Sequence, residues 1–216
     1  VPIMGTPVGY DTVTFEDIGA ILRKYHIEDK LPRNVARYLL DYDPAQETPQ
    51  TMTNDVDYYI VNTLPDSCQA ALEAAEEMGI PAHVLTTYAE GESRDYGTFM
   101  ASLAHEVVKN ERPFRAPCFL FSAGETTTAI PDSSLIRGHG GPSQEMTASF
   151  AVAAEGLKNV CLLSMDSEGT DGTTPVAGGL TDGTTGTAAA ERGIDLRKAL
   201  REHAAYEALE PLGDTV

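Results

Sequence analysis

Four carboxylates lie close together in a glycine- and threonine-rich stretch at residues 165–185, directly after the apolar run 158–164. These acidic residues are Asp166, Glu168, Asp171 and Asp182. Carboxylate oxygens are the ligands that Mg²⁺ and Ca²⁺ prefer. An EF-hand is excluded, because counting from Asp166 places Asp171 and Ala177 where that loop needs glycine and glutamate. Two interpretations remain open: a solvated acidic loop, and a loop that holds a Mg²⁺–nucleotide complex.

A second stretch, IRGHGGPSQE, has three glycines in four positions. Gly138, Gly140 and Gly141 precede a helix that we expect Ser143 to cap. Backbone N–H groups at a helix N-terminus attract anions, and Arg137 could add positive charge. The spacing matches neither the P-loop nor the dinucleotide-binding fingerprint. An anion cradle and a flexible connector therefore both remain open.

A third candidate loop, SAGETTT at residues 122–128, follows an apolar run. In a tight turn between two strands, Gly124 would supply the conformational freedom that the turn requires. In a ligand site, Gly124 would instead permit close backbone approach, and Glu125 would supply a carboxylate. Both interpretations remain open.

From residue 56 onward, β-prone and helical segments alternate, which is typical of an α/β fold with a largely parallel sheet. The expected strands are 56–62, 82–87, 116–125, 126–130 and 159–166. The expected helices are 65–79, 95–110, 143–156, 185–193 and 195–209. Because ligands bind beyond the carboxyl ends of strands in open α/β sheets, the three loops are expected to lie at or near that edge.

The chain before residue 56 has a different sequence pattern. Apolar periodicity predicts short helices at 14–27 and 31–42, with Pro32 in the first turn of the second helix. We therefore expect residues 1–50 to form a helical connecting segment and residues 51–216 to form the α/β domain.

The composition excludes several classes of protein. The net charge of −18 over 216 residues argues against nucleic-acid and anionic-membrane partners, because both need a basic surface. Three cysteines without C-x-x-C spacing favour a reducing compartment, and no run resembles a membrane span or a signal peptide. We therefore expect a cytoplasmic location. Because the chain does not begin with methionine, we also expect it to be part of a longer polypeptide.

Taken in chain order, the three loops resemble those of the class II glycerate kinases, whose C-terminal region is called the MOFRL domain. SAGETTT is similar to the family's S-G-G-E-T-T-V, and GHGGPSQE is similar to its G-x-G-G-R-N-Q-E. SMDSEGTDGTTPVAGG is similar to its A-x-D-T-D-G-x-D-G-x-T-x-A-A-G-A. NTLPDSCQAALEAAEEMG and AEGESRD also match family segments, so the resemblance covers essentially the whole chain.

The resemblance implies transfer of the γ-phosphoryl group of ATP to D-glycerate, with Mg²⁺. It implies two α/β domains with the active site in the cleft between them, so this chain would be the C-terminal part of such a kinase. The N-terminal domain of the same polypeptide and the small hydroxy acid are then the expected partners, and a homodimer is an expected assembly. The fragment alone is expected to have little activity, because both sides of a cleft align the reactants.

The resemblance also implies roles for individual residues. Asp166, Asp171 and Glu125 are the expected catalytic carboxylates, and the first two are also expected to hold Mg²⁺. The expected substrate- and phosphate-binding residues are Asn62, Arg137, Gly138, Gly140, Gly141, Gln144 and Glu145.

Two positions depart from the family pattern. Pro142 and Ser143 replace an arginine and an asparagine, which removes a cation that could bind a carboxylate or a phosphate; Arg137 could compensate. Glu168 replaces an aspartate. Two other functions therefore remain open, an NAD(P)H-dependent hydroxypyruvate reductase and a non-catalytic nucleotide- or metal-binding fragment. Phosphorylation at carbon 2 and at carbon 3 of glycerate also both remain open.

Overall fold

The computed structural model describes residues 13–47, 49, 51, 54–55, 57 and 59–216. The chain divides into two compact units, Val1–Val61 and Asn62–Val216. This division lies C-terminal to the expected boundary at residue 50. Among the described residues, no helix is both long and apolar enough to cross a membrane.

The first unit is a small helical pair. It contains α1 (Phe15–Tyr25) and α2 (Arg33–Leu40), with 3₁₀ turns at Glu28–Lys30 and Pro44–Gln46. The ring of Phe15 stacks on Tyr42 with the centroids 4.4 Å apart, and it meets Tyr38 edge-on. Both expected helices are confirmed, but Pro32 is the N-cap residue of α2 and does not lie in its first turn.

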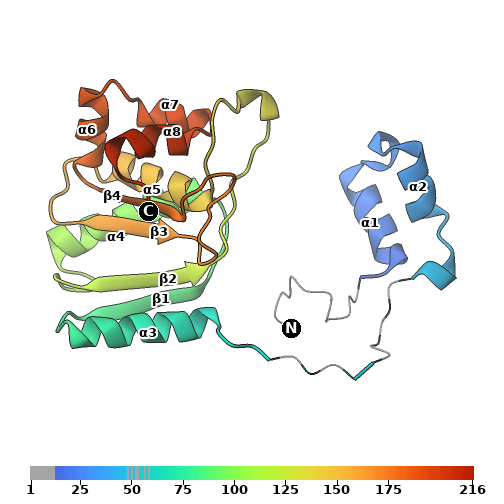
Figure 1. Cartoon of the computed structure of the whole chain (residues 1–216), viewed down its shortest axis with the longest axis horizontal. Coiled ribbons are helices and arrows are strands. Elements are labelled where there is room, and N and C mark those ends of the chain that lie inside the picture. Colours follow the sequence, from blue (N-terminus) through green and yellow to red (C-terminus); the bar gives the residue numbers. More distant parts are fainter. Residues whose placement is uncertain (1–12, 48, 50, 52–53, 56, 58) are drawn as a thin grey trace. The chain divides into compact units, whose positions relative to one another are not determined.

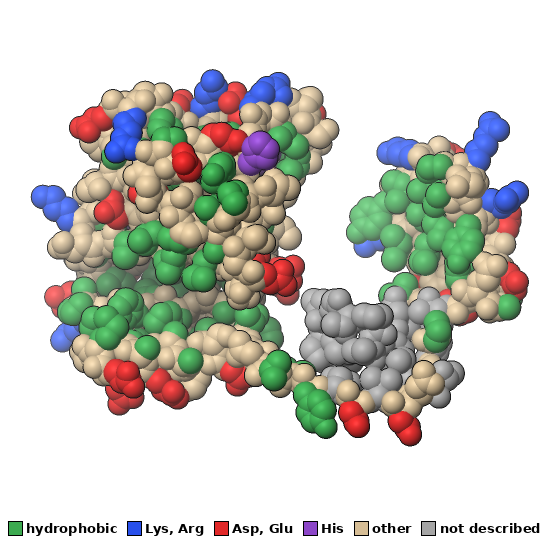
Figure 2. Space-filling model, in the orientation of Figure 1, with side chains coloured by type: hydrophobic (Ala, Val, Ile, Leu, Met, Phe, Trp, Pro, Cys, Tyr) green, Lys and Arg blue, Asp and Glu red, His purple; other side chains and the backbone are tan. Residues whose placement is uncertain are grey.

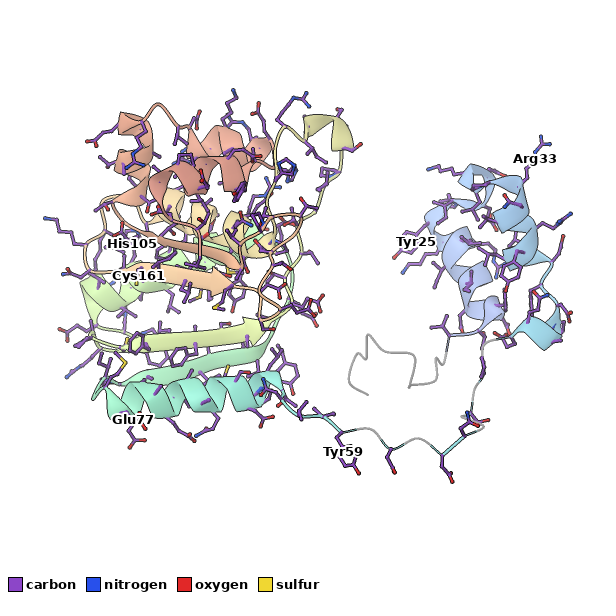
Figure 3. All side chains as sticks on the ribbon, in the orientation of Figure 1. Tyr25, Arg33, Tyr59, Glu77, His105 and Cys161 are labelled. Carbon is purple, nitrogen blue, oxygen red and sulfur yellow. The ribbon has the colours of Figure 1, made fainter. Side chains whose placement is uncertain are left out.

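The strand expected at 56–62 is wrong for the residues that the structure describes, Asp57 and 59–62, which form no strand. Val56 and Tyr58 of this segment lie outside the described residues. Strand backbone needs a neighbouring strand for its N–H and C=O groups, and no described strand pairs with this segment. Its side chains are consequently exposed, as Tyr59 is in Figure 3.

The second unit contains the remaining helices and strands of the described chain (Figure 1). They are α3 (Leu64–Glu77), β1 (Ala82–Ala89), α4 (Ser93–Asn110), β2 (Phe119–Gly124), α5 (Pro142–Ala153), β3 (Cys161–Met165), β4 (Gly178–Asp182), α6 (Thr185–Glu191), α7 (Leu196–Arg201) and α8 (Ala205–Leu209). Short 3₁₀ turns lie at Ser133–Leu135 and Glu210–Leu212. Most of the alternating elements expected from the sequence are thus present, and the α/β class is confirmed.

Two strand pairs make up the sheets of this unit. β1 and β2 pair in parallel, from Ala82 opposite Phe119 to Ala89 opposite Gly124. β3 and β4 pair antiparallel, with Cys161 opposite Asp182. Parallel pairing is therefore confined to β1 and β2 among the described strands.

Strand β4 lies in the stretch that was expected to be all loop. Its first two residues are glycines, which weaken any sequence signal for a strand. The close pairing of the hairpin explains Gly178, since a Cβ there would lie 2.0 Å from the carbonyl oxygen of Ser164. The last residues of the chain add a short edge to β4, because the N–H of Leu180 donates to the carbonyl of Asp214 at 2.8 Å.

Two other expectations also differ from the structure. Residues 126–130 form only an isolated bridge between Glu92 and Thr127, because the segment turns away after one residue pair. The single helix expected at 195–209 is broken into α7 and α8 at His203, whose φ of 50° is incompatible with continued helix.

Helix α5 is the central element of this unit. On one face Phe150 and Ala154 pack against Met100 and Ala101 of α4. On another face Ala151 packs with buried residues of α6, α7 and α8. Figure 1 shows α5 enclosed between α4, the β3–β4 hairpin and the C-terminal helices. Helix α5 therefore fixes the position of α4 relative to the C-terminal helices.

A glycine permits the close contact between α4 and α5. A Cβ at Gly97 would lie 2.1 Å from the carbonyl oxygen of Met146, so any other side chain would separate the two helices. Backbone atoms cannot move aside as a flexible side chain can, and overpacking of this kind is destabilising.

We predict that Gly97→Ala lowers the free energy of unfolding by about 2 kcal/mol or more, measured by urea denaturation of the chain. Gly186→Ala in α6 is the matched control, because its Cβ would meet only the flexible side chain of Glu155 at 3.3 Å. The control should retain or slightly gain stability. Equal effects of the two substitutions would contradict the close helix contact.

Candidate active site

Two of the three loops chosen from the sequence follow strands, β2 and β3, and these strands end at the same edge of the unit. Parallel pairing places the carboxyl ends of β1 and β2 together, and β3 runs in the same direction in Figure 1. Figure 3 shows Cys161, at the start of β3, at the opposite end of the unit. The expectation that these loops gather beyond the carboxyl ends of the strands is therefore confirmed for the loops after β2 and β3.

Gly124 permits close backbone approach, but the backbone that approaches belongs to β1. A Cβ at Gly124 would lie 2.1 Å from the carbonyl oxygen of Ala89. The N–H of Glu125 donates to that same carbonyl at 2.8 Å, and the Glu125 side chain is exposed at the edge. The buried hydroxyl of Ser93, at the start of α4, donates to the carbonyl of Thr127 and so holds the rest of this loop.

Asp171 caps helix α5 from the glycine-rich acidic loop. The N–H groups of Ser143 and Gln144 donate to its two carboxylate oxygens at 3.1 and 2.9 Å. The side chain of Asp171 is 1% exposed. Ser143 was expected to be the cap, and this is wrong, because Gly141 occupies the N-cap position and the capping carboxylate comes from Asp171.

The glycines around this cap admit the carboxylate. A Cβ at Gly141 would lie 2.3 Å from Oδ1 of Asp171, and a Cβ at Gly172 would lie 2.1 Å from the carbonyl oxygen of Gly140. The helix N-terminus that was expected to attract a ligand anion thus already holds an anion of the chain itself.

Gln144 is fully buried beside Asp171. Its side-chain amide donates to Oδ2 of Asp171 and to the hydroxyl of Thr174, both at 2.9 Å. The same hydroxyl donates to the carbonyl of Asp171 at 2.7 Å. Gln144 therefore holds the acidic loop in place through Asp171 and Thr174.

Glu145 is buried in an ion-paired cluster. Its Oε2 lies 2.8 Å from Nε of Arg94, and its Oε1 lies 2.7 Å from Nδ1 of His203. Burial raises the pKa of the Glu145 carboxyl, and the hydrogen bond with His203 and the charge of Arg94 offset only part of that effect. Arg94 also donates to the carbonyl of Leu200 at 2.8 Å. This cluster connects α4, α5 and the turn between α7 and α8.

Arg94 and His203 were not among the residues chosen from the sequence. Arg94 lies in the segment AEGESRD, which was recognised as similar to a family segment, so that segment was the signal for it. His203 had no comparable signal, because the chain reversal that buries it follows only from the packing of α7 and α8.

The remaining glycine of the IRGHGGPSQE stretch packs against α8. A Cβ at Gly138 would lie 2.4 Å from Oε2 of Glu207. The N–H of His139 donates to that oxygen at 2.8 Å, and Nδ1 of His139 lies 2.7 Å from Oε1. Burial raises the pKa of the Glu207 carboxyl, but the hydrogen bonds from His139 outweigh burial and hold it below its ordinary value. The stretch is thus fixed at both ends and is not a flexible connector.

Two predicted binding residues make only local contacts. Arg137 donates to the carbonyls of Ser134 and Ile136 within its own exposed loop. The side-chain amide of Asn62 donates to the hydroxyl of Ser67 at 2.9 Å, at the start of α3. Neither residue contacts the acidic loop or the start of α5.

The two carboxylates predicted to hold Mg²⁺, Asp166 and Asp171, differ in burial and in their hydrogen bonds. Both oxygens of Asp171 accept hydrogen bonds from the start of α5 and its side chain is 1% exposed, so in this structure Asp171 serves as the helix cap. Asp166 is half-buried at the end of β3, where its Oδ1 accepts the N–H of Glu168 at 2.8 Å. Among the described residues, no three His, Cys, Asp or Glu side chains are grouped so as to hold a metal ion.

Comparison with known proteins reveals relatives over nearly the whole chain. The chain is 37% identical over 214 residues to a glycerate 2-kinase of Pyrococcus horikoshii and 35% identical over 211 residues to a D-glycerate 2-kinase of Thermotoga maritima. A putative hydroxypyruvate reductase of Agrobacterium vitis is 30% identical over 214 residues. These alignments cover 98–99% of this chain and 47–48% of the relatives, so the chain spans about half the length of the curated relatives it matches.

Two solved structures resemble the fold. The crystal structure of a glycerate kinase from Thermotoga maritima gives a TM-score of 0.73 at 35% identity, and that of a Pyrococcus horikoshii protein gives 0.69 at 36% identity. Each match covers 95% of this chain and 47% of the other. The MOFRL family model matches residues 118–216, which contain the Asp171 cap and the acidic loop. The resemblance read from the three loops is therefore confirmed: the MOFRL family model matches the C-terminal part of the chain, and the glycerate kinase relatives match nearly all of it.

Proposed function

We propose that this chain forms part of a glycerate 2-kinase, which transfers the γ-phosphoryl group of ATP to the 2-hydroxyl of D-glycerate. One observation carries the proposal: relatives named glycerate 2-kinase align with 98% of the chain at 35–37% identity. The same names favour carbon 2 over carbon 3.

The edge beyond β2 and β3 offers two carboxylates and a backbone N–H that phosphoryl transfer could use. The transition state is loose, so catalysis depends on positioning and on neutralising charge. Glu125 is exposed and Asp166 is half-buried, each directly following the end of a strand. The N–H of Gly140 donates no hydrogen bond within the described residues, which leaves it for a phosphate or substrate oxygen.

Asp166 is the proposed protein ligand for Mg²⁺. In proteins this ion usually keeps several waters and binds one or two carboxylates together with substrate phosphates, so it needs no cage of protein side chains. When bound, Mg²⁺ would neutralise charge on the phosphates of ATP. Asp171 has the separate task of fixing the start of α5 and, through Gln144 and Thr174, the shape of the acidic loop.

The cation that binds the glycerate carboxylate is proposed to come from outside these 216 residues. Arg94 is paired with the buried Glu145, and Nη1 of Arg137 donates to two carbonyls of its own exposed loop. Pro142 removes the cation that the family pattern places at the start of α5. A site completed by the other half of the protein accounts for this deficit, and we expect little turnover from the chain alone.

The decisive experiment incubates the complete polypeptide that contains this chain with ATP, Mg²⁺ and D-glycerate and follows the products by ³¹P NMR. A phosphomonoester resonance coupled to the single proton on carbon 2 is the expected result. Unchanged ATP from folded protein would contradict the kinase. Oxidation of NAD(P)H by hydroxypyruvate would then support the reductase that the Agrobacterium name suggests. Nucleotide binding without either product would instead support a non-catalytic protein.

We predict that Asp166→Asn lowers kcat of the complete enzyme by about a hundredfold or more, because a charge that stabilises the transition state is lost. Raised Mg²⁺ should partly restore the rate. Glu77→Gln is the control, since it makes the same charge change at the far end of α3 (Figure 3). A rate close to that of the wild type in Asp166→Asn would remove Asp166 from the mechanism.

We predict a different outcome for Asp171→Asn. The asparagine NH₂ would face an N–H donor at the start of α5, so the free energy of unfolding should fall by about 2–4 kcal/mol. Urea denaturation measures the loss, and Asp166→Asn, at a half-buried position, should unfold as the wild type does. An Asp171→Asn protein with unchanged stability and abolished activity would instead assign Asp171 to the chemistry.

A further inference from the structure

A hollow of about 380 Å³ lies between α4, α5 and α7, away from the acidic loop. Its lining residues are Thr98 of α4, Ser149, Val152 and Ala153 of α5, and Arg197, Leu200 and Arg201 of α7. None of them belongs to the loops that follow β2 and β3. We call this the α4–α5–α7 hollow.

The charge of the hollow is opposite to that of the chain. The protein has 33 acidic and 15 basic residues, yet the charged side chains that line the hollow are two arginines. Arg197 and Arg201 are four residues apart and therefore share one face of α7. Figure 2 shows Lys and Arg side chains interspersed with acidic ones over α6 and α7, whereas the charged side chains along α3 are mostly acidic.

Both guanidinium groups lack a partner within the part of the chain that the structure describes. Neither Arg197 nor Arg201 makes an ion pair or a side-chain hydrogen bond there, although Lys198 on the same helix is 3.9 Å from Glu202. Both arginines are exposed, so their guanidinium groups are open to a ligand with several anionic oxygens.

The rest of the lining sets the size and shape of the ligand. Val152, Ala153 and Leu200 provide an apolar wall, which suits a small carbon skeleton next to the anionic group. The hydroxyls of Thr98 and Ser149 both donate to the carbonyl of Arg94, at 3.0 and 2.7 Å, so the arginines are the donors left for the ligand.

The same contacts tie the hollow to the buried cluster around Glu145. Thr98 and Ser149 hold the backbone of Arg94, and Leu200 accepts a hydrogen bond from its guanidinium. A ligand that moves α7 relative to α4 would therefore change the support of Glu145 at the start of α5.

We propose that the α4–α5–α7 hollow is an anion site for a small phosphate monoester, distinct from the active-site edge, whose occupation stabilises the packing of α7 on α4 and α5. Arg197 and Arg201 bind the phosphoryl oxygens, and Val152 and Leu200 contact the carbon skeleton. This assignment does not depend on the proposed kinase activity.

The test is a titration of the complete polypeptide that contains this chain, labelled with ¹⁵N, with inorganic phosphate and then with glycerol 3-phosphate, at ionic strength held constant with NaCl. Saturable amide shifts are expected at Thr98, Val152, Ala153 and Leu200, with tighter binding of the ester because of the apolar wall. Arg197→Gln/Arg201→Gln should weaken binding by roughly tenfold for each guanidinium lost. The control Lys158→Gln/Lys198→Gln removes the same charge outside the hollow and should bind as the wild type does.

Several outcomes would overturn the proposal. If the wild-type protein shows no saturable shifts at the four lining amides, the proposal is wrong, and this measurement needs no variant. Equal weakening in both double variants would mean non-specific attraction to net charge. Shifts confined to Gly140 and Gly141 would assign phosphate to the active-site edge alone. The amide spectrum of each variant without phosphate verifies that it is folded, and the single variant Arg201→Gln replaces the double variant if the latter unfolds.

Discussion

A carboxylate can be buried in a protein only where hydrogen-bond donors surround it, and the start of α5 supplies those donors to Asp171. The interaction joins two segments that are far apart in the sequence, the glycine-rich stretch before α5 and the loop after β3. Because α5 is enclosed by α4, β3–β4 and the C-terminal helices, its position determines theirs. The position of the loops at the edge therefore depends on the capped helix α5.

A second buried carboxylate, Glu145, lies in the first turn of α5 and has a different kind of hydrogen-bond environment. Asp171 accepts hydrogen bonds from neutral backbone and amide groups, whereas Glu145 is paired with Arg94 and lies against His203. Burying an ion pair contributes little net stability, but removing one partner is costly because the other is left uncompensated. Such a cluster favours one specific arrangement of α4, α5 and α7 over other compact arrangements.

Local patterns were sufficient to predict most elements and the gathering of two of the candidate loops, since periodicity and the position of strand ends are properties of neighbouring residues. They were not sufficient for features that depend on contacts distant in sequence. Ser143 had the right residue type for a cap, yet Asp171 took the role because the fold brings it there. Strand β4 was missed because Gly178 and Gly179 serve the hairpin contact and give no strand signal. The segment 59–62 has a strand-like composition without a described strand to pair with.

The glycines at the edge have a consequence for how such a site can diversify. Gly124, Gly141 and Gly172 each place backbone where a Cβ would overlap another atom, so these positions tolerate almost no replacement while the backbone path is retained. The departures from the family pattern, Pro142, Ser143 and Glu168, lie at other positions of these loops. Substitutions at those other positions change side chains while the three glycines keep the backbone path of the loops.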